Sequence, residues 1–248
     1  MRMLWPTPLD EVTDEDLMRI YGYPPEIATS WVQVNFVSSA DGAATLDDRS
    51  EALSHPADKR IFLLGRDLAD VVMVGAGTVR AEGYRGARTT SERRERRKSL
   101  GLSEIPPIVV VTATARLDPG CALFTDTYVP PIIVTSEHAP RERRDALAAA
   151  GGEVLVVGER MVDLPAALTE LSRRGLKRVN CEGGPHLFGE LIAADLVDQL
   201  CLTMAPLLAG GGADRIAVGR TTSESRRMEL ASILYEDGFS MLRYRRPS

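Results

Sequence analysis

Apolar residues form two patterns that alternate along the chain: short continuous runs typical of strands, and stripes at helical spacing. Strands are predicted at 31–37, 70–74, 108–112, 132–135, 154–157, 178–181 and 199–204. Helices are predicted at 54–68, where Ser54 would be the cap, at 141–150, at 164–174 and directly after 184. Strands that alternate with helices imply an α/β fold, a three-layer sandwich with a mostly parallel central sheet and helices on both faces.

The two ends of the chain depart from this alternation. Asp237-Gly238 lies between apolar runs at 228–235 and 239–244, which predicts a C-terminal antiparallel hairpin. Residues 1–30 contain four prolines, which break regular structure and predict an irregular arm. We therefore divide the chain into an N-terminal arm, 1–30, and one domain, 31–248.

Composition and charge narrow the class of protein. The 248 residues are 44% hydrophobic and 26% charged, which is typical of a globular protein. The net charge of −5 argues against nucleic acid as a partner. No apolar run is long enough to span a bilayer, and the first residues lack the apolar core of a signal peptide. We expect a cytoplasmic protein without a membrane partner.

Cysteine and histidine positions offer no metal site. Cys121, Cys181 and Cys201 are far apart and form no C-x-x-C pair, so free thiols are expected. The three histidines lack the spacing of metal ligands. We therefore expect that the protein holds no metal.

A dense basic run at 93–98 is interrupted by one glutamate and contains no apolar residue. Segments of this kind are usually solvated, so we predict a surface loop or an exposed helix here. Its role is left open by the sequence.

The most informative segment is Gly183-Gly184, which follows the strand at 178–181 and opens a helix. Two glycines let the backbone come close to a ligand, and the free N–H groups of a helix start favour phosphate. The segment does not match the dinucleotide fingerprint G-x-G-x-x-G. The alternative is a tight strand-to-helix turn without a ligand.

A second glycine segment ends the strand at 70–74. Gly75 and Gly77 are followed by Thr78, and small residues with one hydroxyl suit close contact with a nucleotide. In open α/β sheets, ligands bind beyond the carboxyl ends of the strands. The alternative is that these residues form a turn and that Thr78 is a helix cap.

Four segments together resemble the pyrimidine reductase domain of riboflavin biosynthesis, which has a dihydrofolate-reductase-like fold. They lie at 35–42 (NFVSSADG), 70–82 (DVVMVGAGTVRAE), 182–185 (EGGP) and 202–211 (LTMAPLLAGG). In this family the reductase follows, or is separate from, a zinc deaminase domain. The chain has no H-x-E and no P-C-x-x-C, so the arm at 1–30 stands where a deaminase would, and deamination is expected elsewhere.

The resemblance implies hydride transfer from NADPH to the ribosyl group of a ribosylaminopyrimidine 5′-phosphate, of the 5-amino-6-(5-phosphoribosylamino)uracil type, which gives the ribityl product. It also suggests a homodimer built partly on the C-terminal strands. One alternative is a reductase of dihydrofolate or another pteridine. An alternative of another class is a regulatory protein that binds NADPH without turnover. The sequence leaves the true substrate, the stereochemistry and the order relative to deamination open.

Matching positions imply a set of cofactor contacts. These are Gly75, Gly77, Thr78, Glu82, Thr114, Gly183, Gly184, Pro185, His186 and Leu187. Thr114 would lie near a 2′-phosphate, where Arg80 or Arg116 would add charge, or it belongs only to a polar loop after a strand. The related folate enzymes place a cis peptide in the glycine segment, so we predict one between Gly183 and Gly184.

Two carboxylates are expected to be catalytic, Asp41 and Glu182. Asp41 is our first choice for contacting the pyrimidine and assisting proton transfer, although an Asp-Gly turn is the alternative, and Ala40 departs from the family's usual Ser-Leu-Asp-Gly. Glu182 matches a substrate contact, or is only an acid at a helix start. The substrate-binding positions implied are Ser50, Arg66, Arg85 and Arg88. Arg66 would bind the ribose 5-phosphate in a bidentate way, or only complement a helix C-terminus.

Overall fold

The computed structural model describes residues 1–46, 49–219 and 225–247, and within them ten strands form one sheet. The strands are β1 (Arg2–Trp5), β2 (Trp31–Ser39), β3 (Val71–Gly75), β4 (Ile108–Val111), β5 (Ile132–Thr135), β6 (Glu153–Val156), β7 (Arg178–Cys181), β8 (Gln199–Ala205), β9 (Glu229–Glu236) and β10 (Phe239–Arg245). Their order is β1-β9-β10-β8-β2-β7-β3-β4-β5-β6. Strands from β8 to β6 run parallel, whereas β10, β9 and β1 are antiparallel. The mostly parallel α/β sheet with a C-terminal hairpin is confirmed.

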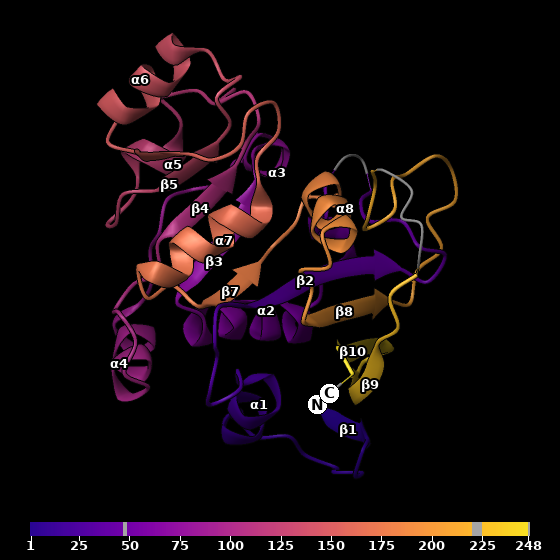
Figure 1. The fold of residues 1–248 in the computed structure, drawn as a ribbon. Coiled ribbons are helices and arrows are strands. Elements are labelled where there is room, and N and C mark those ends of the chain that lie inside the picture. The colour runs from indigo at the N-terminus through magenta and orange to yellow at the C-terminus, as the bar shows by residue number, and fades with distance from the viewer. Residues whose placement is uncertain (47–48, 220–224, 248) are drawn as a thin grey trace.

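Helices cover both faces of the sheet, which gives three layers (Figure 1). They are α1 (Asp14–Tyr21), α2 (Pro56–Leu68), α3 (Ala76–Ala81), α4 (Ser91–Ser99), α5 (Ala122–Thr125), α6 (Arg141–Ala149), α7 (Leu164–Arg173) and α8 (Pro185–Ala193). Side chains alternate across each strand, so Val71 and Met73 pack with α7 and α8. Val72 and Val74 face the opposite core, which includes α5 and α6.

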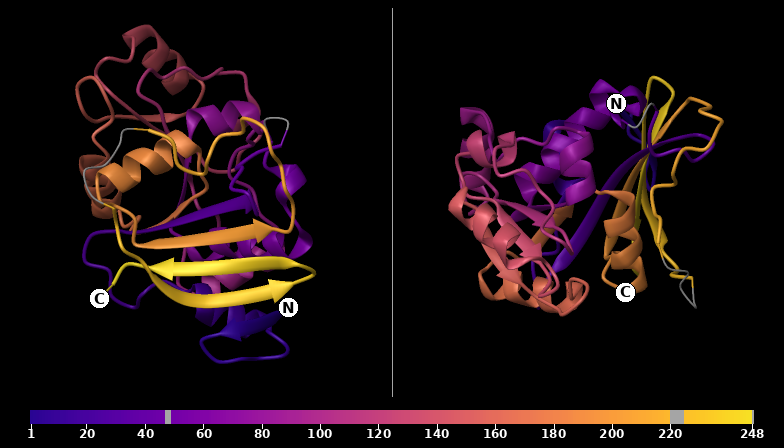
Figure 2. Two further views of the ribbon diagram at one scale, coloured as in Figure 1. Left: turned by 90° about the vertical axis from the view of Figure 1, so that its right-hand side faces the viewer. Right: turned by 90° about the horizontal axis from the view of Figure 1, so that it is seen from above.

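The antiparallel strands have one covered face and one open face. Cys201, Leu234 and Met241 pack against α1 and α2. On the opposite face Leu202, Leu242 and Ile233 lie in one row across β8, β10 and β9. Figure 2 shows no described helix laid across this outer face. The sheet therefore presents partly buried apolar side chains to solvent at this end.

The N-terminal arm is not irregular, so that part of our prediction is wrong. Strand β1 pairs with β9 at the edge of the sheet, and α1 packs on α2. The Thr13 hydroxyl accepts from the Asp16 N–H while the Asp16 carboxylate accepts from the Thr13 N–H, which is a capping box. Leu17, Ile20 and Tyr21 then follow at helical spacing and are buried. The four prolines lie in the segments outside β1 and α1, so neither element is interrupted.

Helix α2 begins one residue later than predicted. His55 is its N-cap, and its ring nitrogen accepts from the Ala57 N–H at 3.3 Å. The Ser54 hydroxyl instead donates to the Asp58 carboxylate at 2.6 Å. Pro56 occupies the first helical position, where its missing N–H costs nothing.

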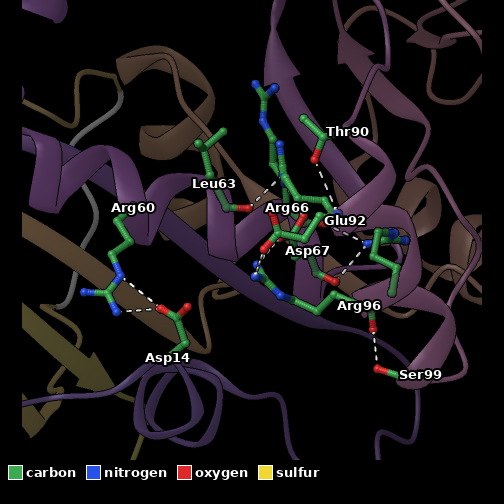
Figure 3. A network of polar contacts seen from close by, with 11 residues as sticks. Asp14, Arg60, Leu63, Arg66, Asp67, Thr90, Glu92, Arg96 and Ser99 are labelled. Carbon is green, nitrogen blue, oxygen red and sulfur yellow. Dashed lines mark hydrogen bonds and ion pairs between the residues drawn. The ribbon is translucent and has the colours of Figure 1, made fainter.

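The basic run forms α4, and the prediction that it is simply solvated is also wrong. Arg97 is fully buried and donates to the carbonyl oxygens of Arg66, Asp67 and Ala69 at the end of α2. The buried Asp67 carboxylate accepts from Arg93 at 2.7 Å and from Arg96 at 2.9 Å. Figure 3 shows Arg96 reaching Asp67 from α4. These arginines fasten α4 to the C-terminal end of α2.

Candidate active site

Two cavities meet at the carboxyl ends of the central strands. The larger, of about 780 Å³, runs along the end of β4, the β3–α3 turn and the start of α8. The smaller, of about 310 Å³, lies between the end of β2 and the first turns of α2. Both are lined by Thr45, Thr78, Glu82, Gly184 and Pro185. Two ligands bound in these cavities would therefore meet at one boundary.

The two glycine segments pack against each other at that boundary. The Gly75 N–H donates to the Gly183 carbonyl at 2.8 Å. A Cβ atom on Gly184 would lie 2.4 Å from the Thr78 hydroxyl oxygen, so no larger residue fits there without displacing Thr78. Gly183 has a φ of +93°, and the Gly183–Gly184 peptide is cis as predicted. Glycine is thus required here for both backbone shape and close approach.

Helix α8 directs its start at the larger cavity. Gly184 is the N-cap and Pro185 is the first helical residue. His186 and Leu187 also line the cavity, and the N–H groups in the first turn of a helix have no partner within the helix. This end of α8 can therefore accept an anion such as a pyrophosphate.

Polar residues at the end of β4 close the far side of the larger cavity. Thr114 lines it together with Arg80 and Arg116. Arg80 donates one N–H to the Arg116 carbonyl at 2.9 Å, which ties the β3 side of the cavity to the β4 side. The positions that we assigned to a 2′-phosphate are brought together.

The smaller cavity is bounded by a buried network around Glu182. The Glu182 side chain is inaccessible, and its two oxygens accept from Nε and Nη2 of Arg66 at 2.7 Å each. The Asn180 amide donates to it at 3.0 Å, and the Tyr84 hydroxyl donates to it as well. A bidentate guanidinium with two further donors fixes the position of this carboxylate.

The charges of this network reinforce each other. Burial lowers the pKa of Arg66, but Glu182 and Tyr84 outweigh it and raise the pKa above its ordinary value. Burial, followed by the nearby Glu182 charge, raises the pKa of Tyr84 well above its ordinary value, so its hydroxyl stays protonated. The guanidinium remains charged and the phenol remains a donor across the physiological range.

Glu82 and Ser50 form a second polar pair at the boundary. The Ser50 N–H and hydroxyl both donate to Oε1 of Glu82, at 3.0 and 2.9 Å. Both residues line the smaller cavity, and Glu82 also lines the larger one. A carboxylate is thus held where two ligands would meet.

Five predicted residues lie outside the lining of both cavities: Gly183, Asp41 and three arginines. Asp41 is exposed, and its carboxylate accepts from the Ser39 hydroxyl and from the N–H groups of Ala209 and Gly210, at 2.5, 3.0 and 2.7 Å. These three hydrogen bonds, with Ser39 first, lower the pKa of Asp41 to about 2. Asp41 therefore fastens the 206–214 loop, and its catalytic role stays a prediction.

The other three are arginines. Arg85 and Arg88 are exposed and form ion pairs with Asp126, at 3.3 and 2.6 Å. Arg66 presents the bidentate face of its guanidinium to Glu182 rather than to a cavity. Among the described residues that line the smaller cavity, Lys59 is the one with a positive charge. Its ammonium lies 3.9 Å from the Glu51 carboxylate.

Sequence reasoning missed Lys59, Asn180 and Tyr84. Asn180 carried a signal, because an amide inside a short buried strand must find hydrogen-bond partners. Tyr84 and Lys59 carried none, since an aromatic residue beside glycine and a lysine on a helix are both common on surfaces. Among the described residues no cluster of His, Cys, Asp and Glu could hold a metal ion. No helix of the described chain is long and apolar enough to cross a membrane.

Comparison with known proteins agrees with this geometry. The model of the RibD C-terminal domain matches residues 30–237. The chain belongs to the RibD C-terminal domain family. A relative from Archaeoglobus fulgidus, 2,5-diamino-6-ribosylamino-4(3H)-pyrimidinone 5′-phosphate reductase, is 35% identical over 73% of this chain and 82% of its own length. A protein of the same name from Aquifex aeolicus is 34% identical over 70% of this chain and 75% of its own length.

The fold of this RibD C-terminal domain family member also matches solved structures. A pyrimidine reductase-like protein from Corynebacterium diphtheriae superposes with a TM-score of 0.80 at 25% identity, covering 88% of this chain and 92% of the other. The family resemblance drawn from the four sequence segments is therefore confirmed.

Proposed function

We propose that this protein reduces the ribosyl group of a ribosylaminopyrimidine 5′-phosphate to the ribityl group, with NADPH, in riboflavin biosynthesis. The observation that carries the proposal is the shared boundary of a 780 Å³ and a 310 Å³ cavity at Thr78, Glu82 and Gly184. Hydride transfer needs two ligands held face to face, and this boundary provides the place. The names of the relatives support the same substrate class.

The larger cavity fits NADPH. Gly184, the N-cap of α8, and the free N–H groups that follow it suit the pyrophosphate, and Thr78 lies against Gly184. Arg80 and Arg116 beside Thr114 suit the 2′-phosphate. When bound, the cofactor supplies the hydride. The protein's task is to hold both ligands and to manage the proton.

The smaller cavity would bind the substrate. Glu182 borders this cavity, but its inaccessible oxygens already accept from Arg66, Asn180 and Tyr84, so it would act through its fixed negative charge rather than through hydrogen bonds to the substrate. Lys59 lines the same cavity and is the cation available to the 5-phosphate, because the Arg66 guanidinium is already paired with Glu182. Ser50 would act by holding Glu82 in place.

Proton transfer falls to Glu82 in this proposal. Opening the ribose ring moves a proton from the glycosylamine nitrogen to the ring oxygen, and reduction of the resulting C=N bond consumes one hydride and one proton. Oε1 of Glu82 is occupied by Ser50, which leaves Oε2 as the atom that would carry the proton. Asp41 is assigned a positioning role, since its two oxygens hold the backbone of Ala209 and Gly210.

The test is NADPH oxidation by the purified protein, followed at 340 nm. The deaminated ribosylaminouracil phosphate, its undeaminated diaminopyrimidinone precursor and dihydrofolate are offered separately. We expect turnover with a ribosylaminopyrimidine phosphate and its loss in Glu82→Gln and Glu182→Gln. Thr169→Val, an exposed change on α7, is the matched control and keeps full activity.

Each other outcome selects an alternative. Turnover of dihydrofolate alone would replace the proposal by a pteridine reductase on the same fold. Tight NADPH binding without turnover of any compound would favour a regulatory NADPH-binding protein. The relative rates with the two pyrimidine phosphates decide whether reduction precedes or follows deamination.

We also infer a homodimer that forms through the open face of β8, β10 and β9. Leu202, Leu242 and Ile233 form an apolar row there, and the neighbouring Trp5 is 48% exposed. Apolar side chains in a continuous row on a surface usually mark an interface. Light scattering is expected to give twice the chain mass, and Leu242→Lys to give the monomer. A monomeric wild-type protein would refute the inference.

A further inference from the structure

A cavity of about 550 Å³ lies at the other end of the molecule, between the N-terminal arm and the antiparallel strands. Pro6, Leu9 and Ile20 provide apolar walls, and Thr7, Ser232 and Arg243 provide polar groups. Among the described residues, none that lines it also lines either cavity of the candidate active site. It is therefore a separate space, and the proposed function does not use it.

Arg243 is the buried charge of this cavity. It is 8% exposed, its Nε donates to the Ser232 hydroxyl at 3.2 Å, and its Nη1 makes a long contact of 3.4 Å with the Gln199 amide oxygen. Its Nη2 donates no hydrogen bond within the described residues. Arg243 lines the cavity and this nitrogen is not fully buried, so the unpaired end of the guanidinium borders the open space.

No described carboxylate balances this charge. The charged neighbour is a second arginine, Arg245, which donates to the Gln199 oxygen at 2.7 Å and to the Gly22 carbonyl. Burial, followed by repulsion from Arg245, lowers the pKa of Arg243 below its ordinary value. Asp16 also lines the cavity, but its carboxylate pairs with Arg19 at 2.8 Å.

Two other arginines, the half-buried Arg66 and the fully buried Arg97, are balanced from within the chain. Arg66 has Glu182, and Arg97 has three carbonyl oxygens at the end of α2 together with the Ser103 carbonyl. A buried guanidinium without a counter-charge is destabilising, because its hydration is lost and nothing replaces it. Beside a cavity, such a group is a ready half of an ion pair whose other half comes from outside.

We propose that this cavity binds a small organic anion. A carboxylate or phosphate group of the ligand pairs with Arg243 and accepts from the Ser232 or Thr7 hydroxyl, while its apolar body packs on Pro6, Leu9 and Ile20. The volume is too large for an inorganic ion alone and fits a molecule with an aromatic or aliphatic body. The ligand clamps the arm onto β9 and β10, so its binding raises the stability of the whole chain.

The experiment measures the melting temperature of the full chain against three probes at constant ionic strength. Phenyl phosphate and benzoate separate a phosphate head group from a carboxylate, and inorganic phosphate tests whether the apolar body is needed. We expect a saturable rise with at least one of the two organic anions. Arg243→Met is expected to weaken that binding by about tenfold or more, the value of a charged hydrogen bond. Arg174→Met, at the exposed C-cap that follows α7, is the matched control and leaves the binding unchanged.

Arg243→Met also separates a ligand site from a structural arginine. In buffer without the organic anions its melting temperature is expected to equal or exceed that of the wild type, because an uncompensated buried charge is gone. Arg243→Lys keeps the charge, loses the fork and is expected to bind between the two. The proposal is overturned if no organic anion raises the wild-type melting temperature, or if Arg243→Met responds as strongly as the wild type.

Discussion

Two regions of the molecule satisfy their arginines in opposite ways. Around α2, Arg66 is matched by Glu182 at 2.7 Å, and Asp67 is matched by Arg93 and Arg96. On the inner face of β10, Arg243 is buried more deeply than Arg66, yet it has a hydroxyl and an amide as partners. The first region is electrostatically complete without a ligand, and the second is not.

This difference separates preorganisation from binding. A carboxylate that is held by its own chain, as Glu182 is, has its position and its charge fixed before any substrate arrives. A guanidinium that lacks a counter-charge, as Arg243 does, gains its partner only when a ligand binds. Replacing Glu182 should therefore lower the free energy of unfolding strongly, whereas replacing Arg243 should leave it nearly unchanged.

The largest effect is expected from Glu182→Gln. The change leaves the half-buried Arg66 without a counter-charge and removes the fixed negative charge that borders the smaller cavity. We expect the free energy of unfolding in urea to fall by about 3 kcal/mol and kcat to fall by about a hundredfold or more. Adding Arg66→Met should recover part of the stability and none of the activity. Equal stability of the wild type and Glu182→Gln would contradict the importance of this pair.

A smaller loss, confined to stability, is expected from Asp67→Asn. Asp67 is 1% exposed and pairs with two arginines that keep some contact with water. The free energy of unfolding should fall by about 2 kcal/mol. Neither kcat nor KM should change, because α4 contributes no lining to the described cavities. A large change in KM would mean that α4 and the active site are coupled.

The contrast between these two carboxylates marks what sequence could and could not predict. Strand and helix periods fixed the parallel sheet, and the segments around Gly75 and Gly184 located the larger cavity, because such backbone constraints are local. The pairing of Arg66 with Glu182 joins residues 116 positions apart and left no local signal. The burial of Arg97 was not predicted for the same reason, since it depends on carbonyl groups of another helix.

Asp41 is a further instance of this limit. An Asp-Gly turn after a strand is compatible with a catalytic acid and with a loop anchor, so the local sequence does not distinguish the two roles. The distinguishing contacts come from Ala209 and Gly210, far along the chain. Only the tertiary arrangement brings those N–H groups to the carboxylate.

An intermediate effect is expected from Lys59→Met. Loss of one charged contact to the substrate phosphate should raise KM for the pyrimidine phosphate about tenfold, with kcat and stability nearly unchanged. Lys98→Met, an exposed lysine on α4 that pairs with Glu95 and Glu104, is the matched control. If KM stays the same, the phosphate lies elsewhere and the Arg66 assignment returns to consideration.

The smallest effect concerns Asp41→Asn and depends on pH. The pKa of Asp41 is lowered from 3.8 to about 2 in the folded protein, so the ionised form is bound more tightly than in the unfolded chain. Its stabilisation is complete above about pH 4 and disappears as the pH falls towards about 2. We expect the urea midpoints of wild type and Asp41→Asn to differ at neutral pH and to converge over that interval. Asp145→Asn, on the exposed side of α6, is the control.

The same variant decides how Asp41 serves the active site. The loop that it holds also carries Asp214, which lines the larger cavity. The Asp214 carbonyl accepts from the Ala44 N–H at 2.9 Å. A loosened loop should raise KM for NADPH a few-fold while kcat at saturating substrate is kept, because no reacting group is removed. A fall in kcat of a hundredfold with an unchanged KM would instead return Asp41 to the catalytic role that its sequence context first predicted.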